Sequence, residues 1–203
     1  KDLVENLRVQ LEKLNHYTFT DAEWERFFGE NITNKNDGIE AKTTKIQEDF
    51  IQVLKTDTGE SKNIYLIDRK NIHNNYLQVI NQYEEGGGYH DTRYDVSILV
   101  NGLPLVHIEL KRRGVQLKEA FNQINRYQRD SFWAGCGLYE YVQIFVISNG
   151  TNTKYYSNTT RANHIKEQQQ GNRNKTKKTS NSFEFSSFWA DSNNKPILDL
   201  IDF

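Results

Sequence analysis

Residues 93–111, RYDVSILVNGLPLVHIELK, contain the pattern that decides the fold. β-branched and aromatic residues alternate with other side chains over residues 94–100, and residues 103–110 are equally rich in apolar side chains, which predicts two strands. Asn101-Gly102 between them is typical of a tight turn. Pro104 stands at the start of the second strand, where a missing N–H is tolerated. The stretch therefore predicts an antiparallel β-hairpin.

Two carboxylates and a lysine gather at the open end of this predicted hairpin. Because side chains alternate along a strand, Glu109 and Lys111 share one face, and closing the hairpin brings Asp95 near both. Two carboxylates, a backbone carbonyl and waters suit Mg²⁺. A lysine beside them could hold or help to deprotonate an attacking water. The pattern predicts a metal-dependent phosphodiesterase centre, and its alternative is an ordinary solvated strand edge.

Residues 114–131 change to helical spacing. Their apolar stripe consists of Leu117, Ala120, Phe121 and Ile124. Gln123 and Tyr127 are four residues apart, so they lie together on one face of this helix, beside the stripe.

An apolar run over residues 141–148 predicts a buried strand that is closed by the turn residues Asn149-Gly150. The order is therefore strand, strand, helix, strand. A helical crossover favours a parallel pair of strands with a right-handed connection. The chain is expected to form a mixed sheet with a helix packed on it.

This order of motifs resembles the PD-(D/E)xK nuclease superfamily, in the branch that carries the RecB-type QxxxY motif. More closely, residues 75–83, 93–114, 120–127 and 145–151 are similar to the nuclease domain of the R subunit of type I restriction enzymes. The resemblance implies an α/β, restriction-endonuclease-like core with a mixed central β-sheet flanked by helices. It also implies Mg²⁺-dependent endonucleolytic cleavage of double-stranded DNA.

The same resemblance gives roles to the residues of the hairpin. Asp95 and Glu109 would be the metal-binding carboxylates, and Leu110 would offer only its backbone carbonyl to the metal. Lys111 would be the catalytic lysine. In this family another helix, often with a glutamate facing the metal, lies on the N-terminal side; Glu48, in the amphipathic segment 45–54, is a candidate, with a solvated helix charge as its alternative.

Gln123 and Tyr127 would belong to the accessory motif of the family, which positions DNA or links cleavage to a motor. The alternative is a polar residue and an amphipathic tyrosine at the rim of a packed helix. His107 shares the face of Glu109 by alternation and is expected to be a packed or hydrogen-bonded histidine.

The formal net charge of −1 excludes a polycation that binds DNA through bulk electrostatics. Basic residues nevertheless surround the proposed centre, and they could hold the phosphodiester backbone near the carboxylates. The candidates for DNA binding are Arg112, Arg113, Lys118 and Arg126. The alternative, strongest for Lys118, is a solvated helix face.

Composition agrees with one sizeable core, since the chain has 203 residues and 12% aromatic residues. No apolar run approaches a membrane span, no signal-peptide pattern is present, and the single cysteine, Cys136, excludes an intramolecular disulfide, so a cytoplasmic protein is expected. The chain lacks any methionine and is expected to be part of a longer protein. It contains no phosphate-binding loop, so ATP would act only on motor domains outside this chain.

Four regions are expected along the chain. Residues 1–57 form an N-terminal helical region, in which residues 3–14 and 21–28 are helical, residues 31–44 form a loop and Asp21 is an N-cap. Residues 58–160 form the nuclease core, residues 161–182 a polar mobile loop, and residues 183–203 the start of a connection toward a motor domain. Trp24, Phe27 and Phe28 are expected in the core.

The resemblance implies double-stranded DNA and the specificity and methyltransferase subunits of a type I complex as partners. Two other functions stay open at this point. One is a resolvase or exonuclease-like nuclease of the same superfamily. The other is a non-catalytic module that keeps the fold for DNA binding or subunit docking.

Overall fold

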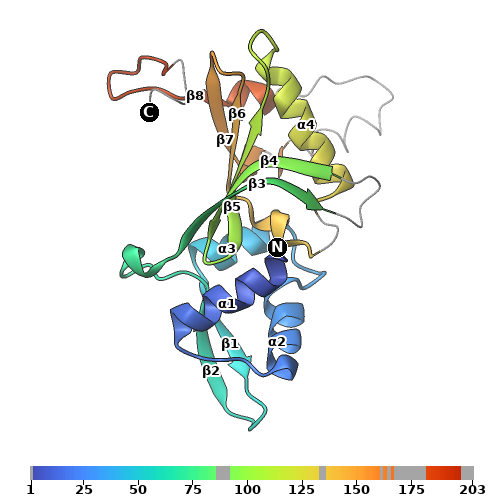
Figure 1. Ribbon diagram of the computed structural model, residues 1–203, viewed down its shortest axis with the longest axis vertical. Coiled ribbons are helices and arrows are strands. Elements are labelled where there is room, and N and C mark those ends of the chain that lie inside the picture. The colour runs from blue at the N-terminus through green and yellow to red at the C-terminus, as the bar shows by residue number, and fades with distance from the viewer. Residues whose placement is uncertain are drawn as a thin grey trace.

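A computed structural model describes residues 2–85, 92–132, 136–160, 162–163, 166 and 182–197. Its main feature is a six-stranded mixed sheet with helix α4 along it, and an N-terminal layer of helices with a small hairpin lies at one end of that sheet (Figure 1). The predicted α/β architecture with a mixed central sheet is confirmed. In the part of the chain that is described, no helix is long and apolar enough to cross a membrane.

The elements follow one another along the chain in this order: α1 Leu3–Asn15, α2 Asp21–Phe27, a π-helical turn Phe28–Ile32, α3 Ile39–Gln47, β1 Ile51–Lys55, β2 Ser61–Tyr65, a 3₁₀ turn Ile72–Asn74, β3 Leu77–Glu85, β4 Thr92–Val100, β5 Leu103–Leu110, α4 Leu117–Asp130, a 3₁₀ turn Leu138–Tyr141, β6 Ile144–Ser148, β7 Thr153–Ser157, a 3₁₀ turn Ser182–Phe185 and β8 Ser187–Phe188. The predicted hairpin and the two predicted helices 3–14 and 114–131 are confirmed.

Strand β5 lies inside the large sheet, whose order is β3-β4-β5-β6-β7-β8. It pairs antiparallel with β4 and parallel with β6, so the predicted parallel pair across the helical crossover is confirmed. A strand that is paired on both sides has its backbone N–H and C=O groups held by two neighbours. β5 is therefore a rigid support for the side chains at its end.

The turn between β4 and β5 fixes how the N-terminal layer attaches. Asn101 and Gly102 both have positive φ, 50° and 87°, as a tight hairpin turn requires. A Cβ built on Gly102 would lie 2.6 Å from the Cα of Leu7, so α1 packs directly on the turn backbone. The buried Asn101 side chain accepts a hydrogen bond from the Tyr76 backbone N–H at 2.8 Å and donates to the Leu66 carbonyl at 3.0 Å.

The expectations for residues 31–44 and for residues 45–54 are wrong. Residues 31–44 are not a continuous loop, because α3 begins at Ile39, and the segment 45–54 is not one amphipathic helix. It divides because α3 ends at Gln47 and residues from Ile51 onward form a hairpin with β2, whose residues lie outside this segment. Glu48 is exposed at the end of α3.

The cap of α2 is Thr20, not Asp21. The Thr20 hydroxyl accepts from the Glu23 backbone N–H, and the Glu23 carboxylate accepts from the Thr20 N–H, which completes a capping box. Asp21 occupies the first turn, where its negative charge interacts favourably with the helix dipole.

The predicted strand 141–148 is also shorter than expected: it starts at Ile144, because residues up to Tyr141 form a 3₁₀ turn.

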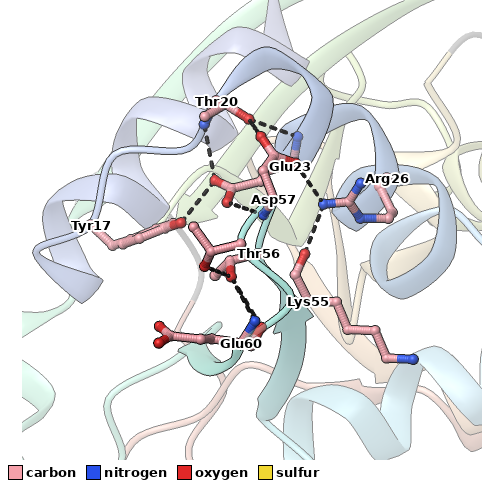
Figure 2. Close-up of polar contacts among 9 residues, drawn as sticks. Tyr17, Thr20, Glu23, Arg26, Lys55, Thr56, Asp57 and Glu60 are labelled. Carbon is pink, nitrogen blue, oxygen red and sulfur yellow. Dashed lines mark hydrogen bonds and ion pairs between the residues drawn. The ribbon is translucent and has the colours of Figure 1, made fainter.

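A polar cluster fastens α2 to the β1–β2 hairpin (Figure 2). Buried Glu23 accepts hydrogen bonds from the Tyr17 hydroxyl at 2.8 Å and from the Asp57 backbone N–H at 3.0 Å. Arg26 donates to the Lys55 carbonyl at 2.7 Å and binds the Asp57 carboxylate at 3.1 Å. Burial would raise the pKa of Glu23, but these donors and the Thr20 N–H favour the carboxylate, and its pKa lies below the ordinary value.

The aromatic residues expected to anchor the N-terminal layer do so. Trp24 and Phe27 are buried, and Phe28 packs against the same core. The expected loop 161–182 lies almost wholly outside the described residues, and the expected division at residue 57 stays a prediction.

Replacing Gly102 by alanine is expected to destabilise the chain by about 2–4 kcal/mol, because the new methyl meets the Leu7 backbone and the residue has positive φ. Urea unfolding followed by circular dichroism measures this change. Gly59→Ala is the matched control, because Gly59 has φ 86° but nothing within 4 Å of an added Cβ. Equal losses in the two variants would show that the close contact with α1 contributes nothing.

Glu23→Gln is expected to lower stability at pH 7 by about 1–2 kcal/mol, since an amide accepts these hydrogen bonds less well than a carboxylate. A carboxylate with a lowered folded-state pKa stabilises the fold above its unfolded-state pKa and loses this contribution as the pH falls through the folded-state value. Wild-type stability should therefore decline below about pH 4.5 more steeply than that of the variant. Urea unfolding at pH 7, 4.5 and 3.5 tests this, and parallel acid limbs would contradict it.

Candidate active site

Asp95 lies where β4 meets the end of β5. The pairing between these strands begins at Val96 and Ile108, one residue further into the sheet. The half-buried Asp95 carboxylate accepts a hydrogen bond from the backbone N–H of Leu110 at 2.9 Å. Its position beside the Glu109–Lys111 segment is therefore fixed by the backbone of β5 itself.

Glu109 is completely buried and is paired with Lys111. The Lys111 Nζ lies 2.7 Å from Glu109 Oε1, and the lysine side chain is 20% exposed. The backbone N–H of Lys111 donates to the Ser148 carbonyl at 2.7 Å, which extends the contact between β5 and β6. An uncompensated buried carboxylate would cost several kcal/mol, so the lysine allows the carboxylate to remain at this position.

Gln123 and Tyr127 of α4 extend the series of polar contacts that begins at Lys111. The lysine also donates to Gln123 Oε1 at 2.5 Å, and the Gln123 amide donates to the Tyr127 hydroxyl. That hydroxyl donates in turn to the Arg93 carbonyl at 3.3 Å, on β4. A chain of polar contacts thus runs from β5 to α4 and back to the strand that carries Asp95.

The charges of both carboxylates affect the pKa of Tyr127. Its pKa is raised to about 12, mainly by burial, and the negative charges of Glu109 and Asp95 add to the increase, while the hydrogen bond from Gln123 opposes it. The phenol stays protonated at neutral pH and can donate to the Arg93 carbonyl. Both carboxylates therefore lie within electrostatic range of the same hydroxyl.

The four basic residues predicted to bind DNA are all exposed. Of these four residues, Arg126 alone lines the hollow of about 430 Å³ beside Lys111. The other residues that line this hollow are Glu119, Asn122 and Gln123. Arg113 extends along the Gly150 turn, since a Cβ on that glycine would lie 3.4 Å from Arg113 Cγ. Arg112 and Lys118 lie outside the lining of the hollow.

Two lining residues, Glu119 and Asn122, were not predicted. With Gln123 and Arg126 they stand at spacings i, i+3, i+4 and i+7, which places all four on one face of α4. This spacing is a signal that the sequence contains.

The donor set fits a hard divalent cation. Within the described ranges no three histidine, cysteine, aspartate or glutamate side chains gather around one point, so protein ligands would come from Asp95, Glu109 and the Leu110 carbonyl. Mg²⁺ often takes only one or two carboxylates and keeps several waters. Lys111 is paired with Glu109 Oε1, and Glu109 Oε2 has no hydrogen bond, which leaves this oxygen available to a cation. Exposed Glu48 at the end of α3 adds no third carboxylate to this group.

Comparison with known proteins gives the same family as the order of motifs. The family described as "Type I restriction enzyme R protein N terminus (HSDR_N)" matches residues 1–164. The type I restriction enzyme EcoprrI endonuclease subunit of Escherichia coli is 48% identical over 203 residues, which cover 100% of this chain and 59% of that protein.

A second relative is the type I restriction enzyme SauCOLORF180P endonuclease subunit of Staphylococcus aureus, 39% identical over 78% of this chain and 17% of that protein. The putative MjaIXP endonuclease subunit of Methanocaldococcus jannaschii is 36% identical over 51% of this chain. The chain thus spans a fraction of the length of these relatives. It belongs to the family of type I restriction enzyme R protein N-terminal domains.

Proposed function

We propose that this chain is the nuclease domain of a type I restriction enzyme R subunit and that it cleaves double-stranded DNA endonucleolytically, with Mg²⁺, in the cytoplasm. One observation carries the proposal above the others. The Lys111 ammonium is held between the Glu109 carboxylate and the Gln123 amide, and the Asp95 carboxylate is bound to the backbone N–H of the preceding residue, Leu110.

Each residue of this arrangement has a distinct task in phosphodiester hydrolysis. Asp95, Glu109 and the Leu110 carbonyl would hold the metal ion. When bound, Mg²⁺ polarises the scissile phosphate and stabilises the leaving oxygen. Asp95 is already oriented by the Leu110 N–H, so little reorganisation is needed on loading.

Lys111 would act directly on the reacting groups. An ammonium has three donors, and two are engaged by Glu109 and Gln123. The third is available to a phosphate oxygen or to the attacking water. Gln123 and Tyr127 would keep the lysine aimed at this point, because their contacts connect it to α4 and to the Arg93 carbonyl.

DNA would reach the site along the exposed basic residues. Arg126 stands in the hollow beside Lys111, and Arg112 and Arg113 directly follow the strand that carries the lysine. Such contacts bind phosphates without reading sequence. Site recognition and methylation would therefore belong to specificity and methyltransferase subunits, and ATP-driven translocation to motor domains of the longer R subunit.

Asp95→Ala in the full-length R subunit, assembled with its partner subunits and supplied with ATP and Mg²⁺, is expected to reduce DNA cleavage about 100- to 1,000-fold, because a metal ligand is lost. Linearisation of a supercoiled plasmid that carries the recognition site measures this activity. Glu60→Gln is the control, since Glu60 is exposed on the β1–β2 turn (Figure 2), and it should cleave like wild type.

Normal cleavage by Asp95→Ala would overturn the proposal. Unfolding midpoints of the 203-residue variants check that both remain folded. If wild-type enzyme binds DNA equally in EDTA and in Mg²⁺, and no divalent metal supports cleavage, the non-catalytic DNA-binding module is the better assignment.

Lys111→Met is expected to destabilise the chain by about 2–3 kcal/mol at pH 7, because it leaves the Glu109 carboxylate buried without its cation. The double variant Lys111→Met, Glu109→Gln should recover most of this loss, since the uncompensated charge is gone. Urea unfolding of wild type, both single variants and the double variant gives the coupling energy. Additive effects would show that the buried ion pair does not hold Glu109 in place.

A further inference from the structure

His107 lies inside the protein, two residues before Glu109 on the same face of β5, and it is 0% exposed. Aromatic rings contact it edge-on, with ring centroids 5.5 to 6.4 Å away: Tyr94, Tyr127, Phe132, Tyr139 and Phe145. An apolar side chain of similar size would suit this environment better than an imidazole.

Neither nitrogen of His107 has a hydrogen-bond partner, and neither has Glu109 Oε2. These two unsatisfied groups face each other, with His107 Nε2 at 3.6 Å from Glu109 Oε2. Buried polar groups are normally paired, so two unpaired ones in contact indicate a contact that tightens in another state of the site.

The hydroxyl groups around the ring are engaged elsewhere. Tyr94 donates to the Ser131 hydroxyl at 2.8 Å, and Tyr139 shares a hydrogen bond of 3.0 Å with Ser97. Tyr127 contacts Gln123 and the Arg93 carbonyl. Among these neighbours, Glu109 offers an acceptor atom, Oε2, that has no hydrogen bond.

We propose that His107 is a positioning residue whose Nε2–H donates to Glu109 Oε2 and so fixes the plane of the carboxylate. This proposal rests on the proposed function, because it concerns how Glu109 is presented to a metal. An approach of less than 1 Å would bring the 3.6 Å separation to an ordinary hydrogen-bond length of about 2.9 Å. Oε1 is held by Lys111, so each oxygen would then have one fixed donor.

The paired backbone of β5 makes this contact effective. The backbone of Glu109 pairs with Ile147 of β6, directly after Ile108 pairs with β4, so the side-chain torsions are its main remaining freedom. A donor on each oxygen removes that freedom before a metal arrives. Outer partners that orient metal ligands commonly change metal affinity 10- to 100-fold when they are removed.

The test compares His107→Phe, which keeps a ring but removes the donor, with His107→Gln, which keeps an N–H donor at a similar position. Mn²⁺, used as a probe of the Mg²⁺ site, is titrated into the 203-residue chain and followed by electron paramagnetic resonance. His107→Phe is expected to weaken Mn²⁺ binding about tenfold without lowering the urea midpoint, and His107→Gln to stay within about threefold of wild type.

Phe145→Leu is the matched control, because Phe145 touches the same ring and carries no polar atom. It should lower the urea midpoint and leave Mn²⁺ affinity unchanged. Wild-type affinity in His107→Phe, or equal weakening in the Phe, Gln and Leu variants, would overturn the positioning role.

Nitrogen-15 NMR separates this proposal from the proposed function. In the metal-free chain, His107 is expected as the Nε2–H tautomer, with an Nε2 shift that changes in Glu109→Gln. The Nδ1–H tautomer would overturn the positioning role even if Mn²⁺ binds. Failure of Mn²⁺ to bind wild type more tightly than Glu109→Gln would instead overturn the proposed function, and this proposal with it.

Discussion

The ion pair between Lys111 and Glu109 is the contact on which the rest of the site depends. A carboxylate with no exposed surface persists only beside a compensating charge, and the lysine supplies it from the same strand. This requirement turns the lysine inward, where it meets Gln123 on α4. The contact of Tyr127 with Arg93 and the hollow beside the lysine lie next to that pairing, on the helix face that the lysine meets.

The sheet makes the arrangement stiff. β5 carries the acidic and basic residues at one end and the Asn101-Gly102 turn at the other, and α1 is pressed against that turn at Gly102. The N-terminal layer therefore packs against the end of the hairpin that is remote from the carboxylates (Figure 1). Contacts around Glu23 add to the stability of this layer. The contact with α1 and the candidate active-site residues thus lie at opposite ends of the same two strands.

Local patterns predicted the centre of the molecule well. The hairpin and α4 carry their periodicities within themselves, and alternation alone places Glu109 and Lys111 together. The prediction failed at residues 45–54, because β1 exists through pairing with β2 and not through its own sequence. The cap of α2 was misplaced by one residue, since Thr20 and Asp21 are both good caps and only the reciprocal bond with Glu23 decides between them. The unsatisfied pair of His107 and Glu109 depends on the surrounding rings, which come from distant segments.

The parallel pairing of β5 with β6 has a consequence for the order of folding. The backbone of Lys111 is bonded to Ser148, and these residues meet only after the chain has passed through α4 and returned. Parallel pairs of this kind form slowly, because the closing of the intervening segment comes before any gain from the contacts. The β4–β5 hairpin can form early, but until β6 pairs with β5 the end that carries Asp95 and Glu109 lacks its second neighbouring strand. Hydrolytic competence would therefore be among the last properties this chain acquires, after most of its secondary structure is in place.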